Sequence, residues 1–172
     1  SGLIPLDKGE ILIDNISISK NIKGWQKKIG YVGQSTYLTN SSIKKNIAIG
    51  LMDNEIDESR IRECIKIVKL EKFVKNLQHG IESFVGEDGV KISGGQKQRL
   101  GIARALYNEP SLIIFDESTN SLDKETESKL LNDITGMKGT VSLIFISHDK
   151  NTLRICDTIY KLNKGFLKST LI

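Results

Sequence analysis

Alternating apolar and polar residues mark the start of the chain. Over residues 9–19 the alternation runs on either side of Asp14 and Asn15, and it predicts two half-buried strands joined by a turn. A short apolar run over residues 28–33 lies between turn-forming residues and predicts a further strand. The first part of the chain is therefore expected to contribute strands to a sheet.

The hydrophobic period becomes helical after residue 34. Residues 41–49 and 57–70 place apolar side chains at helical spacing, and residues 73–77 predict another short helix. In the longest of these segments the apolar side chains form a single stripe, which is made of Ile61, Cys64, Ile65 and Val68. Residues 34–91 are therefore expected to form a helical subdomain.

Helical segments and apolar runs alternate in the second half of the chain. Apolar runs separated by helices are typical of parallel strands covered on both faces. The predicted elements are a helix at 94–107, a strand at 111–115, a helix at 124–134, and strands at 141–146 and 158–162, the last followed by a turn at 163–165. The expected fold class is α/β, one domain in which residues 1–33 and 92–172 form the core around the helical insertion.

Composition restricts the classes of partner. A hydrophobic share of 38% permits a packed core in a chain of 172 residues, and the net charge of +4 is spread along the chain. Without a basic cluster on one face, no nucleic-acid partner is expected.

Cys64 and Cys156 lie far apart in apolar stretches and are expected to be buried thiols in a reducing compartment. We find no apolar run long enough to span a membrane and no signal peptide.

The string SGGQKQR, residues 93–99, carries the strongest chemical signal. Ser93 can cap a helix, and Gly94 and Gly95 allow backbone N–H groups to approach an anion at the helix start. The string resembles the LSGGQ signature of the ABC-type ATPases, with Ile92 in the usual leucine position. The resemblance implies a P-loop NTPase-like sheet flanked by helices. It also implies that ATP is contacted by Ser93, Gly94, Gly95 and Gln96.

A second resemblance to this family lies at the end of the apolar run 112–115. Asp116 and Glu117 follow it directly, as in the family's Walker B strand. A buried strand that ends in two acids presents carboxylates at the carboxyl edge of a sheet, where ligands bind in open α/β folds. The resemblance implies that Asp116 holds Mg²⁺ and that Glu117 is the general base for the attacking water.

Three further residues match family motifs in the expected order. Gln34 resembles the Q-loop glutamine, which reaches Mg²⁺ or the attacking water, although Gly33 replaces the family's usual proline. His148 resembles the switch histidine that contacts the γ-phosphate. Asp123 resembles the D-loop aspartate at the nucleotide site shared with a partner subunit, and it can also cap the following helix.

Two stretches narrow the family to its exporter type. Residues 36–48 and 85–89 are similar to exporter sequences, in which the second segment contacts the membrane domain. The short interval between Gln34 and Ser93 leaves no room for a long coiled coil. The resemblance implies an ATP-hydrolysing domain that pairs head to tail with a second such domain and drives a transmembrane domain at the cytoplasmic face of the cell membrane.

No GxxxxGK[ST] phosphate-binding loop occurs in the sequence. In the family this loop lies just before a stretch like residues 1–5, so we expect the chain to be truncated at its front and inactive alone. Two alternatives stay open. One is a soluble ABC-type ATPase that acts on nucleic acid or ribosomes, and the other is a non-catalytic remnant.

Overall fold

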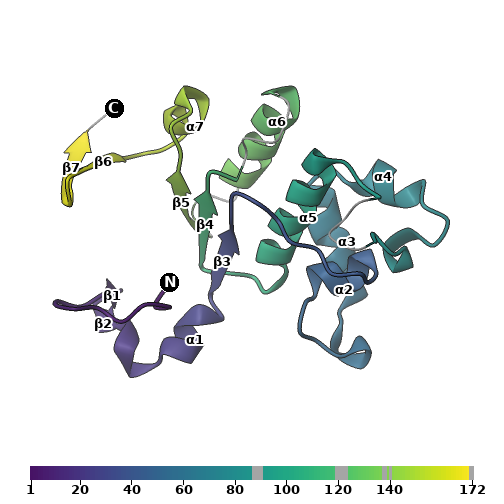
Figure 1. The fold of residues 1–172 in the computed structure, drawn as a ribbon, viewed down its shortest axis with the longest axis horizontal. Coiled ribbons are helices and arrows are strands. Elements are labelled where there is room, and N and C mark those ends of the chain that lie inside the picture. Colours follow the sequence, from purple (N-terminus) through teal and green to yellow (C-terminus); the bar gives the residue numbers. More distant parts are fainter. Residues whose placement is uncertain (87–90, 119–123, 137–138, 140, 171–172) are drawn as a thin grey trace.

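The computed structural model describes residues 1–86, 91–118, 124–136, 139 and 141–170. Figure 1 shows a small sheet with a group of helices on one side and two hairpins on the other. The strands are β1 Leu12–Ile13, β2 Ile16–Ser17, β3 Ile29–Val32, β4 Leu112–Asp116, β5 Ser142–Ile146, β6 Ile159–Asn163 and β7 Phe166–Thr170. The helices are α1 Ile22–Gln26, α2 Ile43–Ile47, α3 Glu58–Ile67, α4 Glu71–Lys75, α5 Gly94–Tyr107, α6 Lys124–Thr135 and α7 Lys150–Arg154. Short 3-10 turns lie at Ile18–Lys20, Asp53–Glu55 and Gly80–Glu82.

The central sheet is parallel, in the order β3-β4-β5. Its connections run through helices, as parallel strands require. The predicted parallel α/β arrangement is therefore confirmed. Because the three strands run the same way, the segments that follow Val32, Asp116 and Ile146 leave the sheet at one edge.

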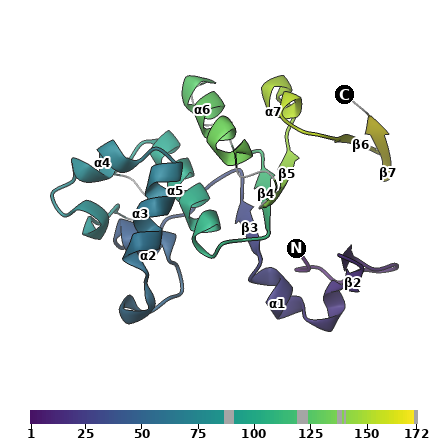
Figure 2. The ribbon, with the colours of Figure 1, turned by 180° about the vertical axis from the view of Figure 1, so that it is seen from behind.

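Two antiparallel hairpins lie away from helices α2–α4, as Figures 1 and 2 show. In the first, Asp14 and Asn15 have φ values of 49° and 63° between β1 and β2. Two consecutive positive φ angles are typical of a type I′ hairpin turn, which asparagine and aspartate tolerate. The predicted strand, turn and strand at 9–19 are thus confirmed, although the strands are shorter than predicted.

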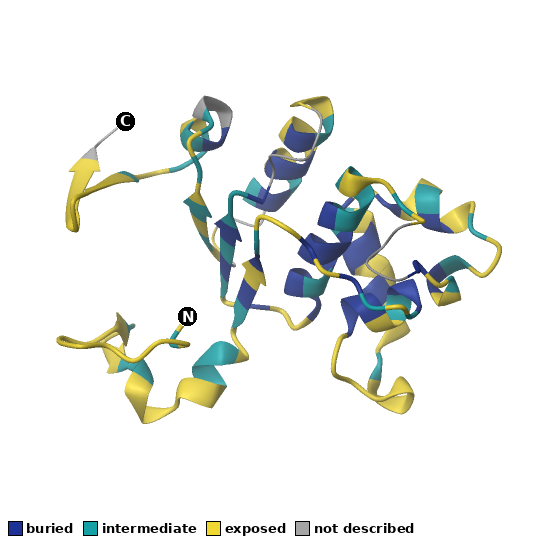
Figure 3. Cartoon of the chain, in the orientation of Figure 1, coloured by how far each residue is buried: buried dark blue, intermediate teal, exposed yellow. Residues whose placement is uncertain are grey.

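Burial alternates along β3 and β4 of the central sheet, where dark blue residues stand next to teal or yellow ones in Figure 3. Ile113 and Phe115 on β4 point into the core, and Phe115 stacks on Phe145 of β5 with ring centroids 4.8 Å apart. On the opposite face Tyr31 and Ile146 are 57% and 50% exposed. The expected cover on both faces is therefore not found in the described residues, because the helices that pack on the sheet share one side.

Helix α5 packs closely on β3 and on the loop after it. A Cβ atom at Gly30 would lie 2.7 Å from the carbonyl oxygen of Ala105, and a Cβ atom at Gly101 would lie 2.3 Å from Oγ1 of Thr36. Real Cβ atoms do not approach other atoms so closely, so both positions need glycine. The two glycines set the distance between α5 and the segment that leads to Gln34.

Helices α2, α3 and α4 lie within residues 34–91, where a helical segment is expected. The stripe of Ile61, Cys64, Ile65 and Val68 is buried, as its spacing predicts.

Cys156 is only half-buried, so the expectation of a buried thiol is wrong at that position. Its chain segment follows the short helix α7 at the margin of the sheet, where fewer residues pack around it. None of the helices in the described ranges is both long enough and apolar enough to cross a membrane.

Candidate functional site

Four of the residues singled out from the sequence lie at the carboxyl edge of the central sheet. Gln34 follows β3, Asp116 and Glu117 end and follow β4, and His148 follows β5. The parallel strands therefore bring together residues that lie far apart in the sequence. This edge is the usual place for ligands in open α/β folds.

Glu117 adopts an uncommon backbone conformation at this edge. Its φ is 47°, and its backbone N–H donates a hydrogen bond to the carbonyl oxygen of Ile146 at 2.9 Å. Left-handed conformations of non-glycine residues are energetically costly and gather at functional sites. The bond ties the end of β4 to the end of β5 and fixes the direction in which the Glu117 side chain leaves the sheet.

The Glu117 carboxylate has a different partner on each oxygen. Nε2 of Gln34 donates to Oε2 at 3.3 Å. Nδ1 of His148 lies 3.5 Å from Oε1, and the His148 side chain is largely exposed. The structure thus brings three predicted catalytic residues into contact, with solvent access for a water molecule or a phosphate group.

Asp116 is held by a residue that the sequence analysis did not single out. The hydroxyl of Tyr31 on β3 donates to Oδ2 of Asp116 at 2.8 Å. This bond raises the pKa of Tyr31 above its usual value, because the deprotonated phenol would face the carboxylate. Tyr31 and Asp116 lie on the same exposed face of neighbouring strands, and this register could have suggested the contact once the sheet order was known.

The signature segment forms the capped start of α5. Oγ of Ser93 accepts from the backbone N–H of Gln96 at 3.2 Å, while Oε1 of Gln96 accepts from the backbone N–H of Ser93 at 2.9 Å. This reciprocal pair is a capping box. A Cβ atom at Gly94 would meet no atom within 4 Å, so the space in front of this helix start is open. The predicted helix and its serine cap are confirmed.

The signature turn and the Glu117 cluster remain separate in this chain. Helix α5 and strand β4 run in opposite directions (Figure 1). The start of α5 therefore lies toward the same side of the sheet as the end of β4. In the part of the chain that the structure describes, no hydrogen bond joins Ser93 or Gln96 to Glu117. Asp123 and residues 87–89 lie outside the described residues.

A buried polar cluster organises the segment between Gln34 and α2. The Asn46 side chain accepts from the backbone N–H of Thr39 at 2.9 Å and donates to the Thr39 carbonyl oxygen at 3.0 Å. Arg104 on α5 donates to the Asn46 carbonyl oxygen at 2.8 Å and to the Tyr37 carbonyl oxygen at 3.0 Å. Burial lowers the pKa of Arg104. These bonds fasten the loop 37–42 to α2 and α5.

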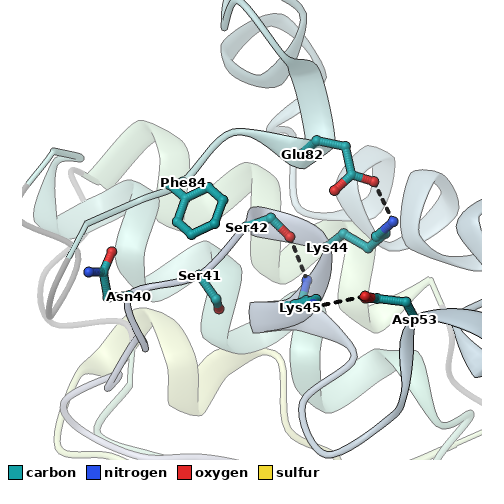
Figure 4. A pocket seen from close by; sticks show the side chains of 8 residues that line it. All are labelled: Asn40, Ser41, Ser42, Lys44, Lys45, Asp53, Glu82 and Phe84. Carbon is teal, nitrogen blue, oxygen red and sulfur yellow. Dashed lines mark hydrogen bonds and ion pairs between the residues drawn. The ribbon is translucent and has the colours of Figure 1, made fainter.

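The surface next to this cluster is hollowed into a cavity of about 380 Å³, shown in Figure 4. Lys44 forms ion pairs with Glu82 and with Glu58, and Lys45 lies 3.1 Å from Asp53. The contact with Glu82 raises the pKa of Lys44. The cavity is lined by Asn40, Ser41, Ser42, Lys44, Lys45, Asp53, Glu82 and Phe84. These residues come from the start of α2 and the loops around it, and from the segment near residue 83. They make the lining polar and charged, with one aromatic side chain.

The donor set around Asp116 suits Mg²⁺. Magnesium in nucleotide sites is bound through one or two carboxylates together with phosphate oxygens and water. Asp116 supplies one carboxylate at the edge of the sheet. Gln34, which could supply an amide oxygen, bonds the next residue, Glu117. Among the described residues no group of three or more His, Cys, Asp or Glu side chains could hold a metal ion. A metal ion at this edge would therefore need further ligands besides these described side chains.

Comparison with known proteins agrees with this geometry. A sequence model described as ABC transporter matches residues 1–120. A putative export ATP-binding/permease protein of Rickettsia typhi is 42% identical over 161 residues, which cover 92% of this chain and 27% of that protein. ABC transporter B family member 22 of Arabidopsis thaliana is 38% identical over 161 residues, 92% of this chain and 13% of that protein.

A solved structure shares the fold. A bacterial Atm1-family ABC exporter with ATP bound superposes with a TM-score of 0.83 at 33% identity, over 92% of this chain and 28% of that chain. The similarity supports the P-loop NTPase-like α/β class expected from the sequence. The chain spans only a minor part of the length of each of these proteins.

Proposed function

The chain belongs to the ABC transporter family, and from this premise we propose that it forms part of the ATP-hydrolysing domain of an exporter. The observation that carries the proposal is the Glu117 carboxylate, which meets Gln34 through one oxygen and His148 through the other at the carboxyl edge of the sheet. The names of the relatives, export ATP-binding/permease proteins among them, support the exporter type.

Glu117 is the proposed general base. Its carboxylate accepts the proton of a water molecule that attacks the terminal phosphate, a role that needs a carboxylate within hydrogen-bond reach of the water. Gln34 fixes one carboxylate oxygen and leaves the remaining lone pairs for the water. His148, whose side chain is exposed, donates a hydrogen bond to the γ-phosphate in this proposal.

Asp116 is the proposed metal ligand. Bound Mg²⁺ supplies positive charge that offsets the charge of the phosphates. Asp116 ends β4 at the sheet edge, and the Tyr31 hydroxyl occupies one oxygen of its carboxylate, Oδ2. Gln34 is the second residue proposed to reach the ion, through its amide oxygen, since the amide nitrogen faces Glu117.

Ser93, Gly94, Gly95 and Gln96 are proposed to serve the nucleotide of a second ABC ATPase domain. The capped helix start offers backbone N–H groups and the positive end of the α5 dipole to an anion. Since no hydrogen bond in the described residues joins it to Glu117, a head-to-tail pair of domains suits this arrangement. Asp123, a residue that the structure does not describe, is proposed to line the same shared site.

The face shown in Figure 4 is proposed to meet a transmembrane domain at the cytoplasmic side of the membrane. Phe84, which lines the cavity, is 64% exposed, and aromatic side chains are enriched at protein interfaces. The lining residues between Asn40 and Lys45 belong to the exporter-like stretch 36–48, and Phe84 directly precedes the second exporter-like stretch in the sequence. The polar cluster of Asn46 and Arg104 keeps the backbone beneath it rigid.

The proposal can be tested in the full-length gene product reconstituted in lipid vesicles. We expect Mg²⁺-dependent ATP turnover that responds to membrane reconstitution and is unchanged by DNA or ribosomes. A Phe84→Asp variant should keep the ATP affinity but lose the response to the membrane. The control Tyr160→Asp, on a distant hairpin, should keep both. Turnover that requires nucleic acid would overturn the exporter assignment.

A further inference from the structure

We propose that Gln98 is a positioning residue, which holds the loop of Gln34 against helix α5 so that Gln34 reaches Glu117. The inference deepens the proposed function and rests on it. Gln98 lies in the string that resembles the family signature, but the site residues inferred from the sequence end at Gln96. Its own contacts point in another direction, toward the loop after β3.

The Gln98 side chain is buried and bonds that loop through both its amide oxygen and its amide nitrogen. It is 3% exposed, its Nε2 donates to the carbonyl oxygen of Gly33 at 3.2 Å, and its Oε1 accepts from Oγ1 of Thr36 at 3.2 Å. The two partners flank Gln34, one immediately before it and one two residues after it. One side chain on α5 therefore holds the backbone carbonyl before Gln34 and a side-chain hydroxyl after it.

Beyond Thr36 the loop is held by Asn46 and Arg104, and next to Gln34 the side-chain contacts from α5 come from Gln98. The loop leaves the sheet after Val32 without regular secondary structure, and the Gln34 side chain is exposed. Gly33 adds backbone freedom, because glycine can adopt conformations that other residues avoid. Without the two bonds from Gln98, Gln34 would sample many positions, and only a fraction of them would place its amide nitrogen 3.3 Å from Glu117.

The packing around Gln98 is built for this contact. Gly101 lies three residues further along α5 and admits Thr36, whose Oγ1 would lie 2.3 Å from a Cβ atom there. Gln98 thus stands in the buried stripe of the helix, beside small residues, where an apolar side chain would be expected. A buried amide that satisfies two loop groups rigidifies the structure around it.

The contact also joins two parts of the proposed mechanism. Gln98 is on the same helix as the capped signature turn at Ser93, and Gln34 contacts Glu117. A shift of α5 therefore moves the Gln34 loop with it. When a second domain binds the signature end of α5, the resulting movement of the helix therefore changes the position of Gln34 relative to Glu117.

The test uses the full-length gene product and four versions of it: wild type, Gln98→Met, Gln34→Ala and the double variant. Methionine matches the shape of glutamine and removes both hydrogen bonds. We expect Gln98→Met to lower kcat about tenfold and to leave KM for ATP within about threefold, since both hydrogen bonds to the loop are lost. In the Gln34→Ala background the same change should lower kcat less than about twofold, because Gln98 acts through Gln34.

Independent effects of the two substitutions, which multiply in the double variant, would overturn the proposal. A rise in KM with unchanged kcat would also overturn it. Gln78→Met serves as the matched control, because Gln78 is exposed on a different segment. This control should leave both constants at their wild-type values.

A second measurement does not depend on ATP turnover. Amide hydrogen exchange over residues 33–38 should become about tenfold faster in Gln98→Met, while the amides of α5 keep their protection. Equal exchange in the variant and the wild type would overturn the proposal even if the protein hydrolyses no ATP. Absence of turnover in the wild type would refute the proposed function and leave the exchange result to decide the role of Gln98.

Discussion

Gln34 and Glu117 stand 83 positions apart in the sequence, and Nε2 of Gln34 donates to Oε2 of Glu117 at 3.3 Å. The contact exists because β3 and β4 are parallel neighbours and end at the same edge of the sheet. His148 reaches the other carboxylate oxygen from the end of β5. The sheet order therefore brings the segments that carry the proposed catalytic group to one edge.

Tyr31→Phe should change the metal dependence of ATP turnover. The Tyr31 hydroxyl occupies Oδ2 of Asp116 at 2.8 Å, and an exposed hydrogen bond of this kind contributes about 0.5–1.5 kcal/mol. Since the hydroxyl competes with a metal ion for the carboxylate, we expect the Mg²⁺ concentration for half-maximal turnover to fall about two- to tenfold. A titration of turnover against Mg²⁺ measures this. A higher Mg²⁺ requirement would show instead that Tyr31 orients Asp116 for the ion.

Gly101→Ala should destabilise the protein. The new Cβ atom would lie 2.3 Å from Oγ1 of Thr36, and crowding of a packed core typically costs about 1–3 kcal/mol. Gly94→Ala is the matched control, because its Cβ atom would enter open space at the start of the same helix. Urea unfolding followed by circular dichroism should show a lower free energy of unfolding for Gly101→Ala alone. Equal values for the two variants would contradict the packing described for α5.

The prediction for Asn46→Ala concerns the loop after Gln34. Removal of the amide leaves the backbone N–H and carbonyl of Thr39 without their partner, and a buried unsatisfied polar group costs about 1–3 kcal/mol. Asn54→Ala changes an exposed asparagine and should stay within about 0.5 kcal/mol of wild type. Thermal unfolding of both variants tests the difference. A stable Asn46→Ala protein would mean that Arg104 alone holds the loop.

The pH dependence of stability should carry a contribution from Cys64. Burial raises the pKa of the Cys64 thiol from 9.0 to about 11. The folded state therefore binds the thiol proton more tightly than the unfolded state does. The associated stability is complete below pH 9 and is lost as the pH rises toward 11. Urea unfolding between pH 8 and 11 should show a shallower loss for Cys64→Ala than for wild type, and identical slopes would contradict the burial of this thiol.

Periodicity predicted the elements well where the apolar pattern was long. The stripe of Ile61, Cys64, Ile65 and Val68 and the parallel runs that became β4 and β5 are examples. The short helices α1 and α7 escaped prediction because polar caps, and not an apolar period, mark their starts. Asn21 starts α1 by accepting from the Gly24 backbone N–H at 2.9 Å, and Asp149 accepts from the Thr152 backbone N–H in α7.

The candidate site was predictable only in part. Motif order identified Gln34, Asp116, Glu117 and His148, and the structure brings them to one edge. The contacts of Tyr31 and of Gln98 cross long stretches of sequence, and no local pattern contains them. The sequence held one signal for Gln98, which is a polar residue in the buried stripe of a helix. Such a residue needs hydrogen-bond partners, here from another element.

The most direct measurement is ATP binding and turnover by the full-length gene product and its Glu117→Gln variant, with equal Mg²⁺. Glutamine keeps the shape of the side chain but cannot accept a proton from water. We predict that the variant binds ATP as tightly as wild type and that its kcat is lower by about 10²–10⁴-fold, the usual contribution of a general base. A wild-type protein without ATP turnover, or a variant with nearly full turnover, would contradict the account.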